Sequence, residues 1–227
     1  MPYGPRPHED VRYFVRQIIH FLETQDVKMV IVACNSATAA GLHYYQAEFS
    51  IPIIGVIEPG VRAALRHTKN KRVGVIGTSG TIASGAYEQL IEDIDPQVTV
   101  IARACPLFVL IVENGLIDAP EAISVAEEYL APLRQAQIDT LILGCTHYPL
   151  MADVIAKVMG PKVKLISSAE ETARESRVLL QKLNLSKPSN RPARRHRFFV
   201  SDSPNFFNNT GGKLLSMPIN SYQVILS

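Results

Sequence analysis

The chain of 227 residues contains no tryptophan, and only 7% of its residues are aromatic. Its formal net charge of +2 is too small to indicate binding to nucleic acid or to a membrane surface. No apolar run approaches the length of a membrane span, and the first ten residues lack the basic-then-apolar pattern of a signal peptide. These features favour a cytoplasmic protein with a buried core.

Cysteine is also scarce. The three residues Cys34, Cys105 and Cys145 are an odd number in a chain without an export signal, so we expect free thiols rather than a disulfide framework. A zinc site is not predicted, because the sequence has no CxxC pair and no second histidine cluster with ligand spacing. Cys105 lies in an apolar context before Pro106 and is interpreted as structural.

One basic cluster stands out near the C-terminal end. It comprises Arg191, Arg194, Arg195, His196 and Arg197 and follows Ser-Lys-Pro-Ser-Asn. No aromatic residue interleaves it, so we interpret it as a solvated loop rather than a site for a polyanion.

Short apolar runs alternate with stretches of helical period along the whole chain. The predicted strands are residues 28–33, 52–57, 72–76, 98–102, 140–144, 163–166, 197–200 and 223–226. The clearest predicted helices are residues 8–23, 81–92, 119–134, 151–159 and 169–183. This alternation predicts an α/β fold with parallel sheets and flanking helices.

Two cysteines occupy similar places in this pattern. Cys34 and Cys145 are each the first residue after a predicted strand, at the carboxyl end where active groups of parallel sheets gather. Two thiols that face each other across a cleft would suit the inversion of a stereocentre.

The surroundings of the first thiol allow two interpretations. Cys34-Asn35-Ser36 opens a predicted helix, whose N-terminus would lower the thiol pKa and hold a carboxylate. Alternatively, Cys34 packs as a small hydrophobic residue.

Similar alternatives apply to the second thiol. Gly144 would let a ligand approach the backbone, Thr146 offers a hydroxyl, and His147 would act as a proton partner of Cys145. Otherwise the segment is a helix start with Pro149 in its first turn.

Two further candidates carry weaker signals. Residues 77–81, Gly-Thr-Ser-Gly-Thr, form either an anion-binding cup or a tight turn with a threonine cap. Glu113 follows an apolar run and is expected to be partly buried, as a proton partner or as an acid at a helix start.

Four ordered motifs together resemble bacterial glutamate racemases. They are Ala-Cys-Asn-Ser-Ala-Thr-Ala at 33–39, Gly-Val-Ile-Glu-Pro-Gly at 55–60, Val-Ile-Gly-Thr-Ser-Gly-Thr-Ile at 75–82 and Leu-Gly-Cys-Thr-His-Tyr-Pro-Leu at 143–150. The resemblance implies a cofactor-independent enzyme that interconverts L- and D-glutamate and supplies D-glutamate for peptidoglycan.

The resemblance also implies an architecture and a set of site residues. It implies two pseudo-symmetric α/β domains, residues 1–57 with 168–227 and residues 58–167, with the active site in the cleft between them and a possible homodimer. Cys34 and Cys145 would be the catalytic acid/base pair, with His147 tuning Cys145 and Glu113 supporting it. The glutamate-binding residues would be Tyr3, Gly4, Asn35, Ser36, Thr78, Thr81, Thr146 and His147.

One departure from the family pattern is expected to matter. The family begins with a strand and an Asp-Ser-Gly loop, and this sequence starts at the later Pro-Tyr-Gly segment. We therefore hypothesise a truncated chain whose Cys34 lacks a supporting aspartate. The alternatives are a weakly active or inactive remnant that binds glutamate or a partner, or a racemase for a related substrate such as aspartate or a hydantoin.

Overall fold

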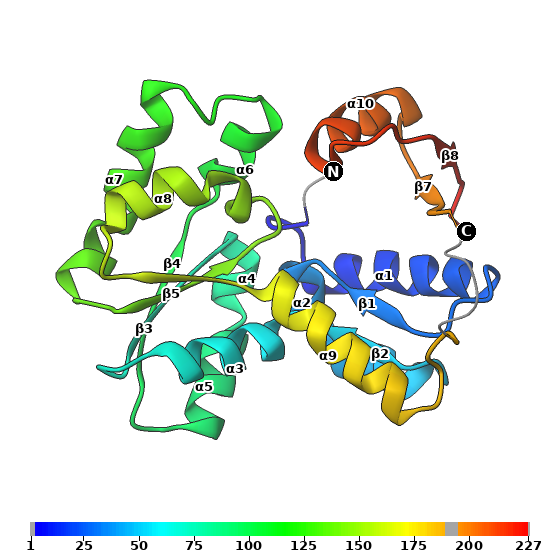
Figure 1. Ribbon diagram of the computed structural model, residues 1–227, viewed down its shortest axis with the longest axis horizontal. Coiled ribbons are helices and arrows are strands. Elements are labelled where there is room, and N and C mark those ends of the chain that lie inside the picture. Colours follow the sequence, from blue (N-terminus) through cyan, green and yellow to red (C-terminus); the bar gives the residue numbers. More distant parts are fainter. Residues whose placement is uncertain (1–2, 189–194, 227) are drawn as a thin grey trace.

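The computed structural model describes residues 3–188 and 195–226. The largest sheet in this part of the chain has four parallel strands in the order β4-β3-β5-β6 (Figure 1). These strands are β3 (Arg72–Gly77), β4 (Thr99–Ala104), β5 (Thr140–Gly144) and β6 (Lys164–Ser167). The predicted α/β fold with parallel sheets is confirmed.

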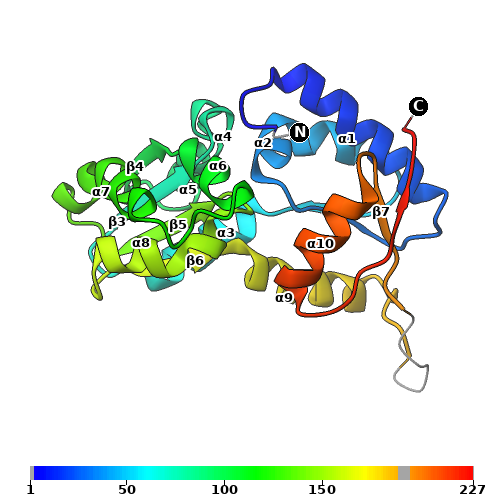
Figure 2. The same ribbon diagram turned by 90° about the horizontal axis from the view of Figure 1, so that it is seen from above.

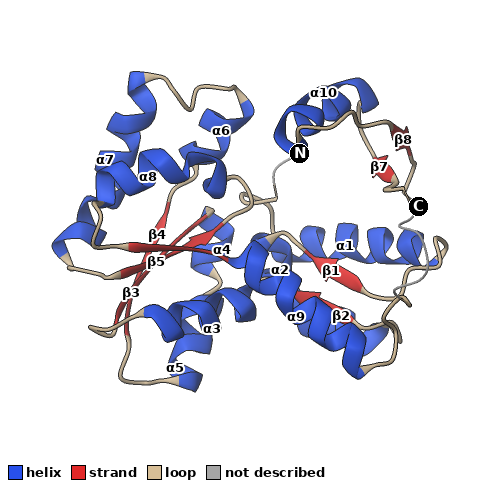
Figure 3. Cartoon of the chain, viewed as in Figure 1, coloured by secondary structure: helices blue, strands red, loops and turns tan. Residues whose placement is uncertain are grey.

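Helices cover both faces of this sheet, as Figure 3 shows by the red strands between blue helices. One face packs against α6 (Leu107–Glu113), α7 (Pro120–Gln135), the 3-10 helix η1 (Tyr148–Met151) and α8 (Ala152–Met159). The other packs against α3 (Ile57–His67) and α5 (Ala86–Ile94). Successive residues of β5 alternate between the two cores, with Leu141 and Leu143 in one and Ile142 in the other. This explains the near-continuous apolar run of β5.

Two smaller parallel sheets lie beside the large one. β1 (Val30–Val32) pairs with β2 (Ile53–Gly55), and this pair packs with α1 (His8–Glu23) and α2 (Asn35–Glu48). β7 (Phe198–Val200) pairs with β8 (Ser221–Gln223) next to α10 (Pro204–Leu215). Seen from above, α1, β7 and α10 gather on the side away from the four-stranded sheet (Figure 2).

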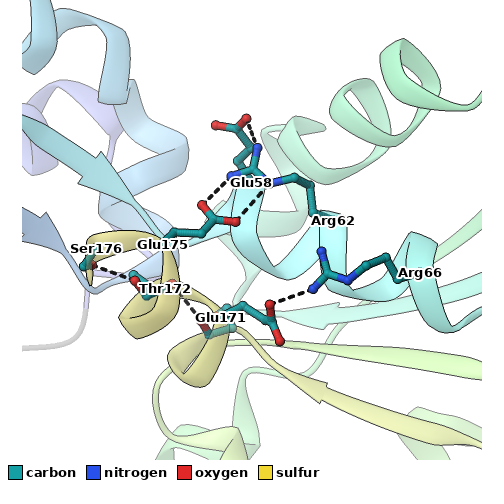
Figure 4. A network of polar contacts seen from close by, with 8 residues as sticks. Glu58, Arg62, Arg66, Glu171, Thr172, Glu175 and Ser176 are labelled. Atoms are coloured by element: carbon teal, nitrogen blue, oxygen red, sulfur yellow. Dashed lines mark hydrogen bonds and ion pairs between the residues drawn. The ribbon is translucent and has the colours of Figure 1, made fainter. Parts of the chain in front are cut away.

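Two connections join the large sheet to the small ones. Helix α3 follows β2, and helix α9 (Ser168–Lys182) follows β6. The two helices pack against each other and are tied by ion pairs (Figure 4). Arg62 of α3 contacts Glu58 and Glu175, and Arg66 lies 2.6 Å from Glu171 of α9. The strands on either side are therefore linked through a shared helix pair.

Several predicted boundaries are wrong for identifiable reasons. The strand predicted at 52–57 ends at Gly55, because the apolar residues Val56 and Ile57 are the N-cap and the first residue of helix α3. The helix predicted at 81–92 is two helices, α4 (Ser79–Ala83) and α5, separated at Gly85 with a φ of +65°. The strand predicted at 223–226 pairs at 221–223 instead. Helix α10 is not among the predicted helices, and none of its side chains is buried.

Candidate active site

Cys34 is the second residue after the end of β1 and is the N-cap residue of α2, half-buried. Burial is the largest influence on its pKa and raises it. Hydrogen bonds from the backbone of Ala37 and Ser36, and from the Ser36 hydroxyl, lower it by less. The expected lowering of the Cys34 pKa is therefore wrong in its net direction, because the loss of hydration outweighs the helix N-terminus.

Cys145 lies directly after β5 and is buried. The pKa of this thiol is raised to about 11, chiefly by burial and also by the neighbouring Cys34, against hydrogen bonds from His147, Thr146 and Tyr148 that lower it. The two thiols, far apart in sequence, thus lie within electrostatic reach of each other. Both are protonated at neutral pH unless something removes a proton.

His147 links Cys145 to an acid. Its Nδ1 lies 3.7 Å from Cys145 Sγ and 3.4 Å from the Thr146 hydroxyl, and its Nε2 lies 2.6 Å from Glu113 Oε1. Glu113 is exposed and is the last residue of α6. The helix-start alternative for Glu113 is wrong, because the apolar run before it itself forms the helix. The proton-partner alternative stays a prediction.

Three buried hydroxyl groups meet between α2 and α4. Ser36 Oγ lies 2.9 Å from Thr78 Oγ1 and 3.0 Å from Thr81 Oγ1, and the two threonine oxygens are 3.1 Å apart. Thr78 also caps α4 by accepting from the Thr81 N–H, as the threonine-cap interpretation predicted. The structure thus brings together hydroxyl groups from two separate sequence motifs.

The Pro-Tyr-Gly segment lies against the same cluster. The carbonyl of Gly4 accepts a hydrogen bond of 3.0 Å from the Gly80 N–H, and a Cβ on Gly4 would lie only 2.7 Å from Thr78 Cβ. The pKa of Tyr3 is raised, first by burial and then by Cys34. Tyr3 and Gly4 are therefore close to the first thiol and to the threonines.

Gly144 has a different role from the one expected. A Cβ on Gly144 would lie 2.6 Å from the Ile76 carbonyl oxygen and 3.2 Å from Tyr87 Cε2. The space beside Gly144 is thus filled by strand β3 and a tyrosine ring, and is not open to a ligand.

Tyr87 is the site residue that the sequence did not reveal. It is fully buried on α5, and its hydroxyl donates a hydrogen bond of 2.6 Å to Asn35 Oδ1. In the sequence it looks like any core aromatic of an amphipathic helix, so only its contact with Asn35 distinguishes it.

The model of the Asp/Glu/hydantoin racemase family matches residues 1–176. The chain belongs to this family. Racemases are isomerases, so the chain is an isomerase. The resemblance to glutamate racemases is confirmed.

Its relatives are similar along nearly all of this chain. The glutamate racemase of Geobacter metallireducens is 46% identical over 227 residues, which are 100% of this chain and 84% of that protein. The crystal structure of glutamate racemase isoform RacE1 from Bacillus anthracis has a TM-score of 0.94 at 44% identity, covering 99% of this chain and 84% of the other. That of glutamate racemase from Francisella tularensis in complex with D-glutamate has a TM-score of 0.91 at 34% identity, covering 100% and 84%.

The remaining candidates of the sequence are Cys105 and the basic cluster. Cys105 is fully buried, and burial raises its pKa to about 12, as a structural cysteine should behave. Of the basic cluster, Arg191 and Arg194 lie outside the described residues. Arg195, His196 and Arg197 are exposed, and Arg197 donates a hydrogen bond of 3.1 Å to Gln25.

The described residues hold neither a cluster of metal-binding side chains nor a membrane-spanning helix. No three side chains of His, Cys, Asp or Glu in 3–188 and 195–226 are grouped in a way that could hold a metal ion. Over the same ranges, no helix is long and apolar enough to cross a membrane.

Proposed function

We propose that this racemase-family protein interconverts L- and D-glutamate without a cofactor, with Cys34 and Cys145 as the two acid/base groups. The observation that carries the proposal is the pair of thiols, each at the carboxyl end of a parallel strand and close enough for Cys34 to raise the pKa of Cys145. The relatives described above are glutamate racemases, which supports glutamate as the substrate of this chain.

The proposed site lies between two α/β domains. Residues 1–57 with 168–227 would form one domain and residues 58–167 the other. This division is supported by α3 and α9, which begin at Ile57 and Ser168 and connect the large sheet with the small ones.

Proton transfer would proceed from one face of the substrate to the other. One cysteine, as thiolate, takes the α-proton and becomes a thiol, while the opposite thiol gives its proton to Cα and becomes a thiolate. Because burial keeps both thiols protonated, the reacting one must first lose its proton. For Cys145 the acceptor would be His147, held by Glu113. For Cys34 the amides of Ser36 and Ala37 would stabilise the thiolate.

Binding of the substrate would use donors around the thiols. The hydroxyl groups of Ser36, Thr78 and Thr81, the amide of Asn35, the Thr146 hydroxyl and the Tyr3-Gly4 segment would hold the two carboxylates and the amino group. Donors placed in advance around Cα would stabilise the charge that develops when the α-proton leaves. The D-glutamate formed would serve peptidoglycan synthesis in the cytoplasm. The protein would form a homodimer.

The decisive experiment is α-proton exchange. Incubation with each glutamate enantiomer in D2O should give product with deuterium at Cα and inverted optical activity. Cys34→Ser and Cys145→Ser should each reduce racemisation to background, whereas Cys105→Ala should retain it, since the Cys105 thiol is fully buried and donates to the Arg103 carbonyl of its own segment.

The outcomes separate the proposed function from its alternatives. A folded wild-type protein that exchanges neither enantiomer would contradict catalysis and favour an inactive remnant. Full activity in either serine variant would rule out the two-thiol mechanism. Faster turnover of aspartate than of glutamate in the same assay would show that the protein is a racemase for a related amino acid.

A further inference from the structure

The hydrogen bond between Tyr87 and Asn35 joins the two halves of the site. Asn35 is in the first turn of α2, next to Cys34, and Tyr87 is on α5, which packs against the four-stranded sheet. The Tyr87 ring fits beside Gly144, the residue before Cys145. A single buried side chain therefore contacts the neighbours of both thiols.

The geometry fixes the direction of this bond. A separation of 2.6 Å is typical of an O–H donor to an oxygen, and shorter than the usual N–H···O distance. Burial, and then Cys145, raise the pKa of Tyr87 far above its ordinary value, so the phenol keeps its proton. Tyr87 is therefore the donor, and Asn35 Oδ1 is the acceptor.

With Oδ1 engaged, the amide nitrogen of Asn35 must point away from Tyr87. In the described part of the chain it donates to no other side chain or carbonyl. Asn35 as a whole is buried, with 3% of its surface exposed, but its amide nitrogen is not among the fully enclosed, unpartnered side-chain atoms of those residues. Asn35, the residue after Cys34, thus has an N–H donor without a partner in the described part of the chain.

We propose that Tyr87 is a positioning residue that holds the carboxamide of Asn35 with its NH2 group toward the substrate, where it donates to a carboxylate of glutamate. This inference rests on the proposed function. Without the phenol, the carboxamide is free to rotate, and its oxygen would face the carboxylate in part of the population. The effect should therefore appear in substrate binding more than in turnover.

The test is a double-mutant cycle on racemisation and on glutamate binding by calorimetry. Tyr87→Phe keeps the ring beside Gly144 and removes only the hydroxyl, and it should raise KM for both enantiomers about tenfold, with kcat changed less than threefold. In an Asn35→Ala background the same change should alter KM by less than about twofold, because the group that Tyr87 positions is gone.

Two further variants complete the design. Tyr45→Phe is the matched control, since Tyr45 is also fully buried and donates one hydrogen bond, of 3.3 Å, to the Ala37 carbonyl. It should leave KM within about twofold. Asn35→Asp still accepts from Tyr87 but lacks the N–H donor, so it should lose as much glutamate affinity as Asn35→Ala.

The outcomes distinguish this inference from the proposed function. A wild-type protein that neither racemises nor binds glutamate would overturn both. If wild type is active but Tyr87→Phe has the same effect with and without Asn35, the positioning role is wrong and the racemase function stands. If Tyr87→Phe does not fold, wild-type affinity in Asn35→Asp would overturn the inference by itself.

Discussion

Gly144 is the residue at which packing constrains the site most closely. The neighbouring strand carbonyl of Ile76 and the ring of Tyr87 occupy the space that a Cβ would need. Cys145 follows immediately, so any shift of the backbone at Gly144 moves the thiol as well. Stability and function are therefore coupled at this one position.

Gly144→Ala should destabilise the protein by about 2 kcal/mol, because neither the strand backbone nor the buried ring is free to yield. It should also lower racemisation by displacing Tyr87 and Cys145. The comparison is Gly160→Ala at the end of α8, where φ is +82° and no atom lies within 4 Å of the added Cβ. That variant should lose about 1 kcal/mol to backbone strain while keeping its activity. Denaturant unfolding and a racemisation assay measure both effects; equal activity of the two variants would contradict the coupling.

The sequence predicts the site residues better than their chemistry. Cys34 and Cys145 are visible as first residues after apolar strands, and His147 is visible as a neighbour of Cys145. Their pKa values are not visible, because burial depends on side chains that the fold brings from other elements. Tyr87 and Asn35 meet for the same reason only in the folded chain.

Helices α3 and α9 pack against each other and connect the large sheet with the small ones. Arg62 bridges them by contacting Glu175 through two of its nitrogens, and it also contacts Glu58 on its own helix. An arginine that binds a carboxylate with two nitrogens has defined geometry, so this pair should contribute more than an ordinary surface pair. Figure 4 shows that the second bridge, from Arg66 to Glu171, lies one turn further along α3.

Arg62→Gln should lower the free energy of unfolding by about 1 kcal/mol, with the loss reduced in high salt. Arg174→Gln is the control, since Arg174 is 71% exposed and pairs with Glu171 within the same helix. It should cost less than about 0.5 kcal/mol. Urea unfolding at low and high ionic strength measures both, and equal losses in the two variants would show that the contact between α3 and α9 adds nothing.

Element prediction succeeds where one face or both faces of an element are buried. The bounds of α1 and β5 agree with the prediction, because α1 has an apolar stripe and β5 is buried throughout. It fails at residues 55–57, where a strand passes directly into a helix without a polar break. It fails again at α10, whose side chains are not buried.

The whole molecule buries many groups that ionise only in strong base. Burial raises the pKa of Cys145 to about 11 and those of Cys105 and Tyr45 to about 12, and it raises those of Tyr87 and Tyr148 further. Each folded pKa lies above the ordinary value of the unfolded chain. As pH rises, the unfolded chain therefore loses protons first, and stability falls.

The thermal midpoint should be nearly constant from pH 7 to about pH 8.5 and should fall above it. Each buried thiol or phenol should contribute a loss of up to about 1.4 kcal/mol per pH unit between its unfolded and folded pKa. Cys105→Ala removes one such group, so its midpoint should fall less steeply than that of wild type between pH 9 and about 12. Calorimetric scans across this range measure the slope, and parallel curves for the two proteins would contradict the assignment.

The long-range contacts between the N-terminal and C-terminal segments have a consequence for synthesis on the ribosome. Lys28 donates to the carbonyl of Leu185, and Gln25 accepts from Arg197, whereas all four strands of the large sheet lie between residues 72 and 167. The N-terminal elements therefore emerge first, and these partners follow about 10 to 30 seconds later at usual rates of translation. The four-stranded sheet has all its strands before then. The four-stranded sheet, which carries Cys145, is thus able to fold before the N-terminal elements that carry Cys34 have made their contacts with Leu185 and Arg197.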